Sequence, residues 1–167
     1  MLVALSDTHA DTDPELTPHL RETVRSADLL VHAGDFVTEA VHDRFADLAD
    51  EFVAAEGNSD RHGLAERLPE TATVEWAGLR FLVTHGHRHD GTSLSLLARQ
   101  EGADVVVTGH THRPAVGTLG AVVHVNPGSH ARPRGNRAAY AAFERDTGGV
   151  SVSLRAPSGS EIERERV

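Results

Sequence analysis

The chain contains no cysteine and no lysine among its 167 residues. Without cysteine, no disulfide can stabilise the fold, and redox chemistry gives no information about the compartment. All 16 basic residues are arginine, and 25 acidic residues bring the formal net charge to −9. This acidic balance disfavours general nucleic-acid binding, which requires a basic surface. The same composition is typical of halophilic proteins, although GC-rich codon usage would also replace lysine by arginine.

Long hydrophobic runs are absent as well. No apolar stretch approaches the ~20 residues that span a bilayer. The segment MLVALSDTH at residues 1–9 has neither the basic region nor the cleavage site of a signal peptide. We therefore expect a cytoplasmic protein that does not bind membranes. Aromatic residues make up only 4% of the chain against 39% hydrophobic residues, which predicts a core built mainly from valine, leucine and alanine.

Short apolar runs alternate with helical patterns as far as residue 108, and this order is typical of an α/β arrangement. Helix N-caps are expected at Thr17, Thr38 and Thr92. After Pro114 the pattern predicts mostly strands, joined as hairpins. Two mixed sheets packed together with helices outside suit this order best, in one domain over residues 1–167 with a tail of uncertain structure at 156–167. The expected strands are 2–6, 29–33, 52–56, 73–77, 79–84, 104–108, 115–118, 121–125, 138–144 and 149–155, and the expected helices are 17–26, 38–49 and 92–101.

The segment VVVTGHTHRP at residues 105–114 joins a β-branched run to two histidines in a chain that has 12 histidines. In an extended chain the side chains at i and i+2 point the same way. His110 and His112 could therefore present both imidazoles to one place, unless the turn at Gly109 redirects them. That arrangement would suit a metal if further ligands lie nearby.

Four other expected strands end in similar residues, so that the five endings read DTH, GD, GN, HGH and GHTH. In open α/β sheets, ligands bind beyond the carboxyl ends of the strands, and glycine lets the backbone turn sharply or approach closely there. One such residue alone is more often part of a turn or cap. Five at the same end of their strands indicate a metal site. The candidate donors are Asp7, His9, Asp35, Asn58, His85, His110 and His112.

Seven donors are too many for one ion, which takes about four to six. Two metals about 3.5–4 Å apart can use them if one carboxylate bridges both ions. Imidazole nitrogens combined with carboxylate and amide oxygens, without thiolate, favour manganese, iron, cobalt, nickel or zinc over calcium or magnesium alone. We expect two divalent transition-metal ions, with manganese as the first choice.

The endings in this order and spacing resemble those of the calcineurin-like metallophosphoesterases. The motif NPGS at residues 126–129, followed by Pro133 and Arg134, looks like the small YfcE-type phosphodiesterase branch. The resemblance covers residues 3 to about 145 and implies a four-layer β-sandwich of two mixed sheets flanked by helices. It also implies a homo-oligomer. The resemblance assigns Asp7, His9 and His112 to one metal, Asn58, His85 and His110 to the other, and Asp35 to both.

The activity implied is hydrolysis of a small phosphodiester by a hydroxide that bridges the two metals. In the phosphoprotein phosphatase branch, a histidine after the asparagine protonates the leaving group. Here Ser59 follows Asn58, and a serine hydroxyl is a poor proton donor near neutral pH. His87 and His62 are candidate replacements, whereas His89 is expected to face solvent. Asn58 is expected to position a phosphoryl oxygen as well as a metal.

Other histidines carry weaker expectations. His19, His42 and His130 lie in polar stretches and are expected to be solvated. His32, inside an apolar strand, either orients a metal ligand or is a satisfied core residue. Trp76 and Tyr140 could equally be core residues or stack on a substrate base.

Three alternative functions follow from the same residues. A retromer subunit shares the fold implied by the resemblance and works chiefly as a protein-binding platform, but it lacks the full set of donors present here. A phosphomonoesterase would keep the metals, and the missing acid argues only weakly against it. A non-catalytic metal buffer would not require ligands placed in order at strand ends.

Overall fold

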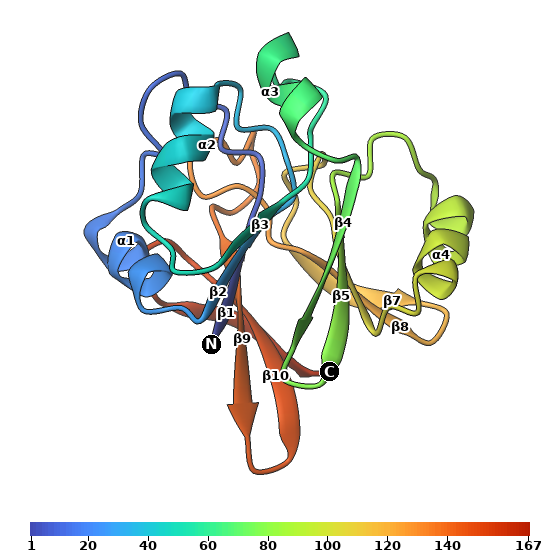
Figure 1. Ribbon diagram of the computed structural model, residues 1–167. Coiled ribbons are helices and arrows are strands. Elements are labelled where there is room, and N and C mark those ends of the chain that lie inside the picture. Colours follow the sequence, from blue (N-terminus) through green and yellow to red (C-terminus); the bar gives the residue numbers. More distant parts are fainter.

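The computed structural model describes residues 1–167 and has two mixed sheets packed face to face with helices on both outer sides (Figure 1). This is the predicted four-layer architecture. None of the helices is long and apolar enough to cross a membrane. The helices are α1 (Pro18–Arg25), α2 (Glu39–Ala46), α3 (His62–Arg67) and α4 (Gly91–Gln100). The strands are β1 (Leu2–Leu5), β2 (Leu29–His32), β3 (Phe52–Ala54), β4 (Thr71–Trp76), β5 (Leu79–Thr84), β6 (Val105–Val107), β7 (Ala115–Leu119), β8 (Val122–Asn126), β9 (Tyr140–Asp146), β10 (Gly149–Arg155) and β11 (Glu161–Arg166).

The strand order brings the carboxyl ends of five strands to one edge of the molecule. One sheet has six strands in the order β11-β10-β9-β1-β2-β3, and the other has five in the order β4-β5-β6-β8-β7. Strands β1, β2 and β3 are mutually parallel, as are β5 and β6. Parallel strands require crossover connections, which α1, α2 and α4 provide. The loops that leave the carboxyl ends of these strands therefore meet at one edge of the two packed sheets.

The core is divided into layers by the alternation of side chains along each strand. In β1, Leu2 and Ala4 face the other sheet, whereas Val3 and Leu5 face α1 and α2. All four side chains are fully buried, as expected for a strand covered on both faces. A smaller third core lies between the second sheet and α4. Burial of each large aliphatic side chain contributes about 1.5–3 kcal/mol, so these layers hold the strand ends rigidly in place.

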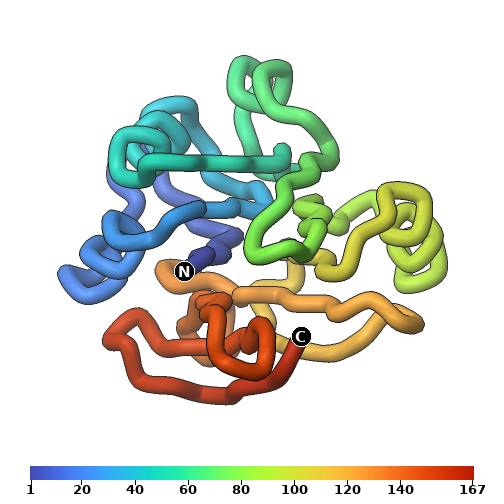
Figure 2. The backbone as a smooth tube through the Cα atoms, turned by 60° about the horizontal axis from the view of Figure 1, so that its bottom comes forward, coloured from blue at the N-terminus to red at the C-terminus, as the bar shows by residue number.

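One predicted helix cap was wrong, and the structure defines the C-terminal segment that the sequence left uncertain. The N-cap of α4 is Asp90 instead of Thr92, and it forms a capping box with Ser93. Residues 156–167, whose structure was uncertain from the sequence, include β11, which pairs antiparallel with β10. Figure 2 shows this red C-terminal segment folded back along the rest of the chain. Its charged side chains suit an edge strand, since they oppose pairing with a second molecule.

Histidines and aromatic residues outside the metal-ligand set are mostly more buried than predicted. His19 is exposed as expected, whereas His42 is half-buried against Phe36 and Phe52. His130 is buried and lies 2.8 Å from the Pro14 carbonyl oxygen through its Nε2, so the prediction of a solvated side chain was wrong. The sequence did not indicate this contact, because Pro14 reaches the loop that carries His130 only through tertiary packing. Trp76 and Tyr140 are both core residues.

Candidate metal centre

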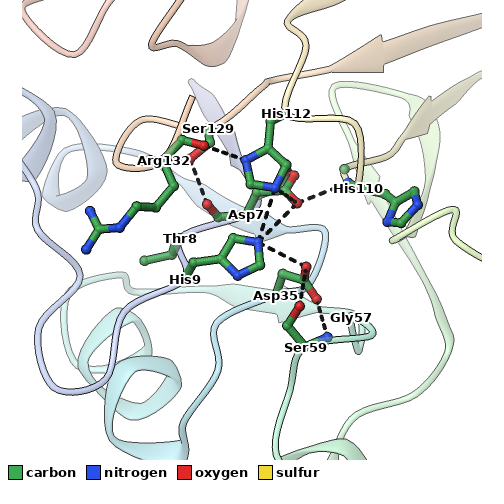
Figure 3. Close-up of polar contacts among 12 residues, drawn as sticks. Asp7, Thr8, His9, Asp35, Gly57, Ser59, His110, His112, Ser129 and Arg132 are labelled. Atoms are coloured by element: carbon green, nitrogen blue, oxygen red, sulfur yellow. Dashed lines mark hydrogen bonds and ion pairs between the residues drawn. The ribbon is translucent and has the colours of Figure 1, made fainter. Parts of the chain in front are cut away.

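The loops after β1, β2, β3, β5 and β6 bring all seven predicted donors to one place, most of them drawn in Figure 3. In the first group, His9 Nε2 lies 3.1 Å from Asp35 Oδ2 and 3.2 Å from His112 Nε2. His112 Nε2 is also 3.2 Å from Asp7 Oδ1. The donor atoms of Asp7, His9 and His112 all lie within 4.8 Å of one another.

The second group lies against the first and shares Asp35 with it. His85 Nε2 is 3.3 Å from Asp35 Oδ2 and 3.2 Å from Asn58 Oδ1. His110 Nδ1 is 3.0 Å from the same Asn58 oxygen. One Asp35 oxygen therefore lies between the two groups. His110 and His112 belong to different groups, as the resemblance implied, because the chain turns after Gly109.

These spacings fit metal ligands. Two neighbouring ligands of an ion with bonds of about 2.0–2.2 Å lie about 3 Å apart. The nitrogens of His9 and His112 face each other at 3.2 Å, and such a pair is favourable when a cation or a proton lies between the lone pairs. The Nδ1 atoms of His85 and His112 donate to the carbonyl oxygens of Ala33 and Arg132. These bonds fix the tautomers, so that each Nε2 lone pair is directed at the centre.

Left-handed backbone conformations turn the donors back over the strand ends. Asp7, His9, Asp35, His110 and His112 have φ angles of 53°, 45°, 62°, 68° and 56°. Such angles are uncommon for residues other than glycine and cost about 1 kcal/mol or more each. Residues held in this way concentrate at functional sites. No local sequence pattern predicts these angles, because aspartate and histidine also adopt ordinary extended conformations.

Glycines at the strand ends allow the close approach that the sequence predicted. A Cβ atom at Gly57 would lie 2.2 Å from Asp35 Oδ1. A Cβ atom at Gly109 would lie 2.8 Å from Asp7 Oδ2. Real Cβ atoms do not approach this closely, so a side chain at either position would displace a donor carboxylate.

The two carboxylates have opposite electrostatic environments. Burial raises the pKa of Asp7 above its ordinary value, and the hydrogen bond from Ser6 Oγ only partly offsets this. Burial also acts to raise the pKa of Asp35, but hydrogen bonds with His85 and His9 outweigh it and hold that pKa far below its usual range. A cation bound between these groups would stabilise both carboxylates in the ionised form.

The comparisons with known proteins decide the family. A model of the calcineurin-like phosphoesterase superfamily domain matches residues 1–148. The chain belongs to the calcineurin-like phosphoesterase superfamily. It is 33% identical over 139 residues to a probable metallophosphoesterase of Methanocaldococcus jannaschii, MJ0623, covering 80% of this chain and 70% of the relative. It is also 33% identical over 112 residues to the phosphodiesterase YfcE of Escherichia coli, covering 64% of this chain and 59% of that protein.

A solved structure shows the same fold. Wild-type Vps29 from Entamoeba histolytica, complexed with Zn²⁺, matches with a TM-score of 0.78. The match covers 99% of this chain and 97% of that chain at 19% sequence identity. Such a low identity carries the fold alone. The superfamily assignment and the resemblance inferred from the strand endings therefore agree.

Ser59 and the candidate proton donor His62 are both placed unfavourably for protonating a leaving group. The Ser59 hydroxyl donates to Asp35 Oδ2 at 3.0 Å, and the Ser59 backbone N–H donates to Asp35 Oδ1 at 2.7 Å. The proton of the Ser59 hydroxyl is therefore already used in a hydrogen bond to the Asp35 carboxylate. His62 is almost fully exposed and pairs with Glu66 on α3, away from the centre. Helix α3 itself was not predicted, since it is short and contains Gly63.

His87 and His89 lie beside the candidate metal centre. The His87 ring centroid is 5.4 Å from that of His85 and 6.2 Å from that of His110, and its Nδ1 has no hydrogen-bond partner. His89 is half-buried, so the expectation that it faces solvent was wrong. It lines a cleft of about 250 Å³ between the centre and α4, together with His85, His110 and His124.

Residues outside the predicted donor set hold the loops of the candidate metal centre in place. Asn126 donates to the Gly109 carbonyl oxygen at 2.7 Å, and Ser129 donates to the Asp7 carbonyl oxygen at 2.7 Å. His32 contacts Thr8 Oγ1 at 2.9 Å through its Nε2, between two donor positions. His32 is thus both buried in the core and linked to a ligand-bearing loop. The NPGS motif was the available signal for the first two residues.

Proposed function

We propose that this chain is a dimetal phosphodiesterase. The observation that carries the proposal is the pair of donor groups that share the Asp35 carboxylate, at spacings suited to neighbouring ligands. Asp7, His9 and His112 would hold one ion, and Asn58, His85 and His110 the other. Manganese is the first choice because the donors are imidazole nitrogens with carboxylate and amide oxygens. When bound, two such ions supply an activated water and offset charge on a phosphoryl group.

The protein's own side chains would then position the substrate. Asn58 lies at the exposed side of the centre, between His85 and His110, where its amide nitrogen can donate to a phosphoryl oxygen. Burial and the neighbouring His85 lower the pKa of His87, so its ring is neutral near pH 7. A neutral imidazole is a weak acid. The enzyme should therefore favour esters whose leaving group needs little protonation.

The cleft beside the centre gives a place for the leaving group. Its volume of about 250 Å³ is small for a binding pocket, and the apolar side chains in its wall are Leu94 and Leu119. His124, which contacts Thr108 Oγ1 at 2.8 Å, also lines the cleft. A small polar alcohol or phenol fits this site better than a nucleobase with its sugar.

An assay with manganese-loaded protein tests the proposal. The protein should hydrolyse an aryl phosphodiester faster than the corresponding aryl monoester, and chelation should abolish the activity. Asp35→Asn should be inactive, whereas Asp50→Asn, an exposed acid without an ion pair, should match the wild type. Full activity of Asp35→Asn, or of the chelated protein, would refute the proposal. A folded protein that binds no manganese would instead favour a scaffold role.

A further inference from the structure

Arg134 has a position that the proposed donor set does not explain. Its Nη2 atom lies 3.4 Å from His9 Nε2, at the exposed mouth of the centre. No carboxylate lies within ion-pair distance of this guanidinium, although the chain carries a net charge of −9. Its backbone is left-handed, with φ of 48°. The proposed donor set explains neither the strained backbone nor the unpaired charge of Arg134.

The loop that carries Arg134 is fixed to the centre at several points. Arg132 forms two hydrogen bonds of 2.6 Å with the carboxylate of Glu15, and its backbone N–H donates to Ser129 Oγ at 2.7 Å. Ser129 in turn donates to the Asp7 carbonyl oxygen, and the Arg132 carbonyl oxygen accepts from His112. Figure 3 shows the Arg132 side chain directed away from the centre. The neighbouring arginines thus differ, since Arg132 anchors the loop and Arg134 lies over the donors.

The contact with His9 cannot persist in the metal-loaded protein. A metal bound by His9 would occupy the lone pair of Nε2, which is the atom that Arg134 contacts. The guanidinium would then have no acceptor at the mouth of an otherwise cation-rich site. An anion with several oxygens satisfies this group best, because a planar guanidinium matches phosphate oxygens in a forked geometry.

We propose that Arg134 binds a non-bridging phosphoryl oxygen of the bound phosphodiester. This inference rests on the proposed function. It makes Arg134 a substrate-binding residue on the His9 side of the centre, whereas the cleft lies on the His85 and His110 side. The two features together would orient the ester, with a phosphoryl oxygen on Arg134 and the leaving group in the cleft.

The kinetic test compares Arg134→Gln and Arg134→Lys with Arg137→Gln. Loss of a charge-assisted hydrogen bond should lower kcat/KM for an aryl phosphodiester by about 10- to 100-fold in Arg134→Gln. Arg134→Lys should recover part of the loss, because it keeps the charge without the fork. Arg137 is exposed in the same segment and has no ion pair, so Arg137→Gln should behave like the wild type.

A binding experiment separates this inference from the proposed function. In isothermal titration, Arg134→Gln should bind manganese as the wild type does, but inorganic phosphate about 10-fold more weakly in the manganese-loaded form. Equal phosphate affinity and equal kcat/KM in an active wild type and Arg134→Gln would overturn the inference alone. Weakened manganese binding by Arg134→Gln would also overturn it, because Arg134 would then support His9. A wild-type protein that binds no manganese would overturn both proposals.

Discussion

Replacement of Asp35 by asparagine should separate folding from metal binding. Asp35 is 2% exposed and accepts from the Ser59 backbone N–H at 2.7 Å, a bond that the asparagine carbonyl oxygen can keep. The change removes the negative charge that faces His9 at 3.1 Å and His85 at 3.3 Å. An asparagine has the same size as the aspartate, and its amide group can donate to or accept from the imidazole nitrogens. The variant should therefore fold.

The expected magnitudes differ between the metal-free and metal-loaded states. Without metal, loss of charge-assisted hydrogen bonds should lower the free energy of unfolding by about 1–2 kcal/mol, or a Tm decrease of about 2–8 °C for a chain of this size. In the wild type, manganese at a hundred times Kd should add about 2.7 kcal/mol per site, which raises Tm by about 5–11 °C. Asp35→Asn should lose this rise, since both donor groups share the carboxylate.

Thermal unfolding of chelated protein, followed by titration with manganese, measures both quantities. Asp50→Asn serves as the control and should keep the full metal-dependent rise. A rise in Asp35→Asn equal to that of the wild type would refute the shared role of Asp35. A wild type whose Tm does not respond to manganese would refute the dimetal centre itself.

Three further predictions test the backbone, the glycine contacts and a buried histidine. In the metal-free protein, the free energy of unfolding in urea should be about 1 kcal/mol higher for His110→Gly than for His110→Ala, because glycine adopts a φ of 68° without strain. Equal stability of the two variants would argue against backbone strain at this position. Gly109→Ala should weaken manganese binding at least about 10-fold in calorimetry, since the new Cβ would meet the Asp7 carboxylate. The control Gly117→Ala should leave manganese binding unchanged, because no atom lies within 4 Å of its Cβ position. Burial lowers the pKa of His130, so the unfolded chain takes up a proton that the folded chain does not, and stability is lost as pH falls below about 6.5. His130→Gln can still donate to the Pro14 carbonyl oxygen but cannot take up the proton. In urea titrations it should reduce the slope of unfolding free energy against pH by up to about 1.4 kcal/mol per pH unit. An unchanged slope would show that His130 does not cause this pH dependence.

Local signals allowed most of the fold to be predicted. Thr17 and Thr38 cap their helices as predicted, because a cap depends on residues only three positions apart. For α4 the cap is Asp90, two residues before the predicted Thr92, because Asp90 and Ser93 form reciprocal hydrogen bonds. Strand β11 could not be predicted, since its sequence EIERER has little apolar alternation and its pairing with β10 depends on distant residues.

The donor residues of the centre could be predicted, but not its geometry. Residue type and position after an apolar run were sufficient to select the seven donors. The resemblance already implied that His110 and His112 belong to different groups, but no local pattern specifies the left-handed φ angles that place them there. Arg134 could not be assigned a role, because its distance to His9 follows from a loop anchored by Glu15, more than a hundred residues away in sequence.

The left-handed residues also show that the geometry of the centre costs part of the stability of the fold. Five strained residues at about 1 kcal/mol each amount to about 5 kcal/mol, a large share of the 5–15 kcal/mol that separates folded from unfolded domains. The layers of buried strand residues and the hydrogen bonds of Asn126 and Ser129 must offset this strain even without a metal. Small zinc domains, by contrast, use the binding energy of the metal to fold. Here the sheets hold the candidate donors about 3 Å apart in advance, so little of the binding energy of a metal would be spent on ordering the chain.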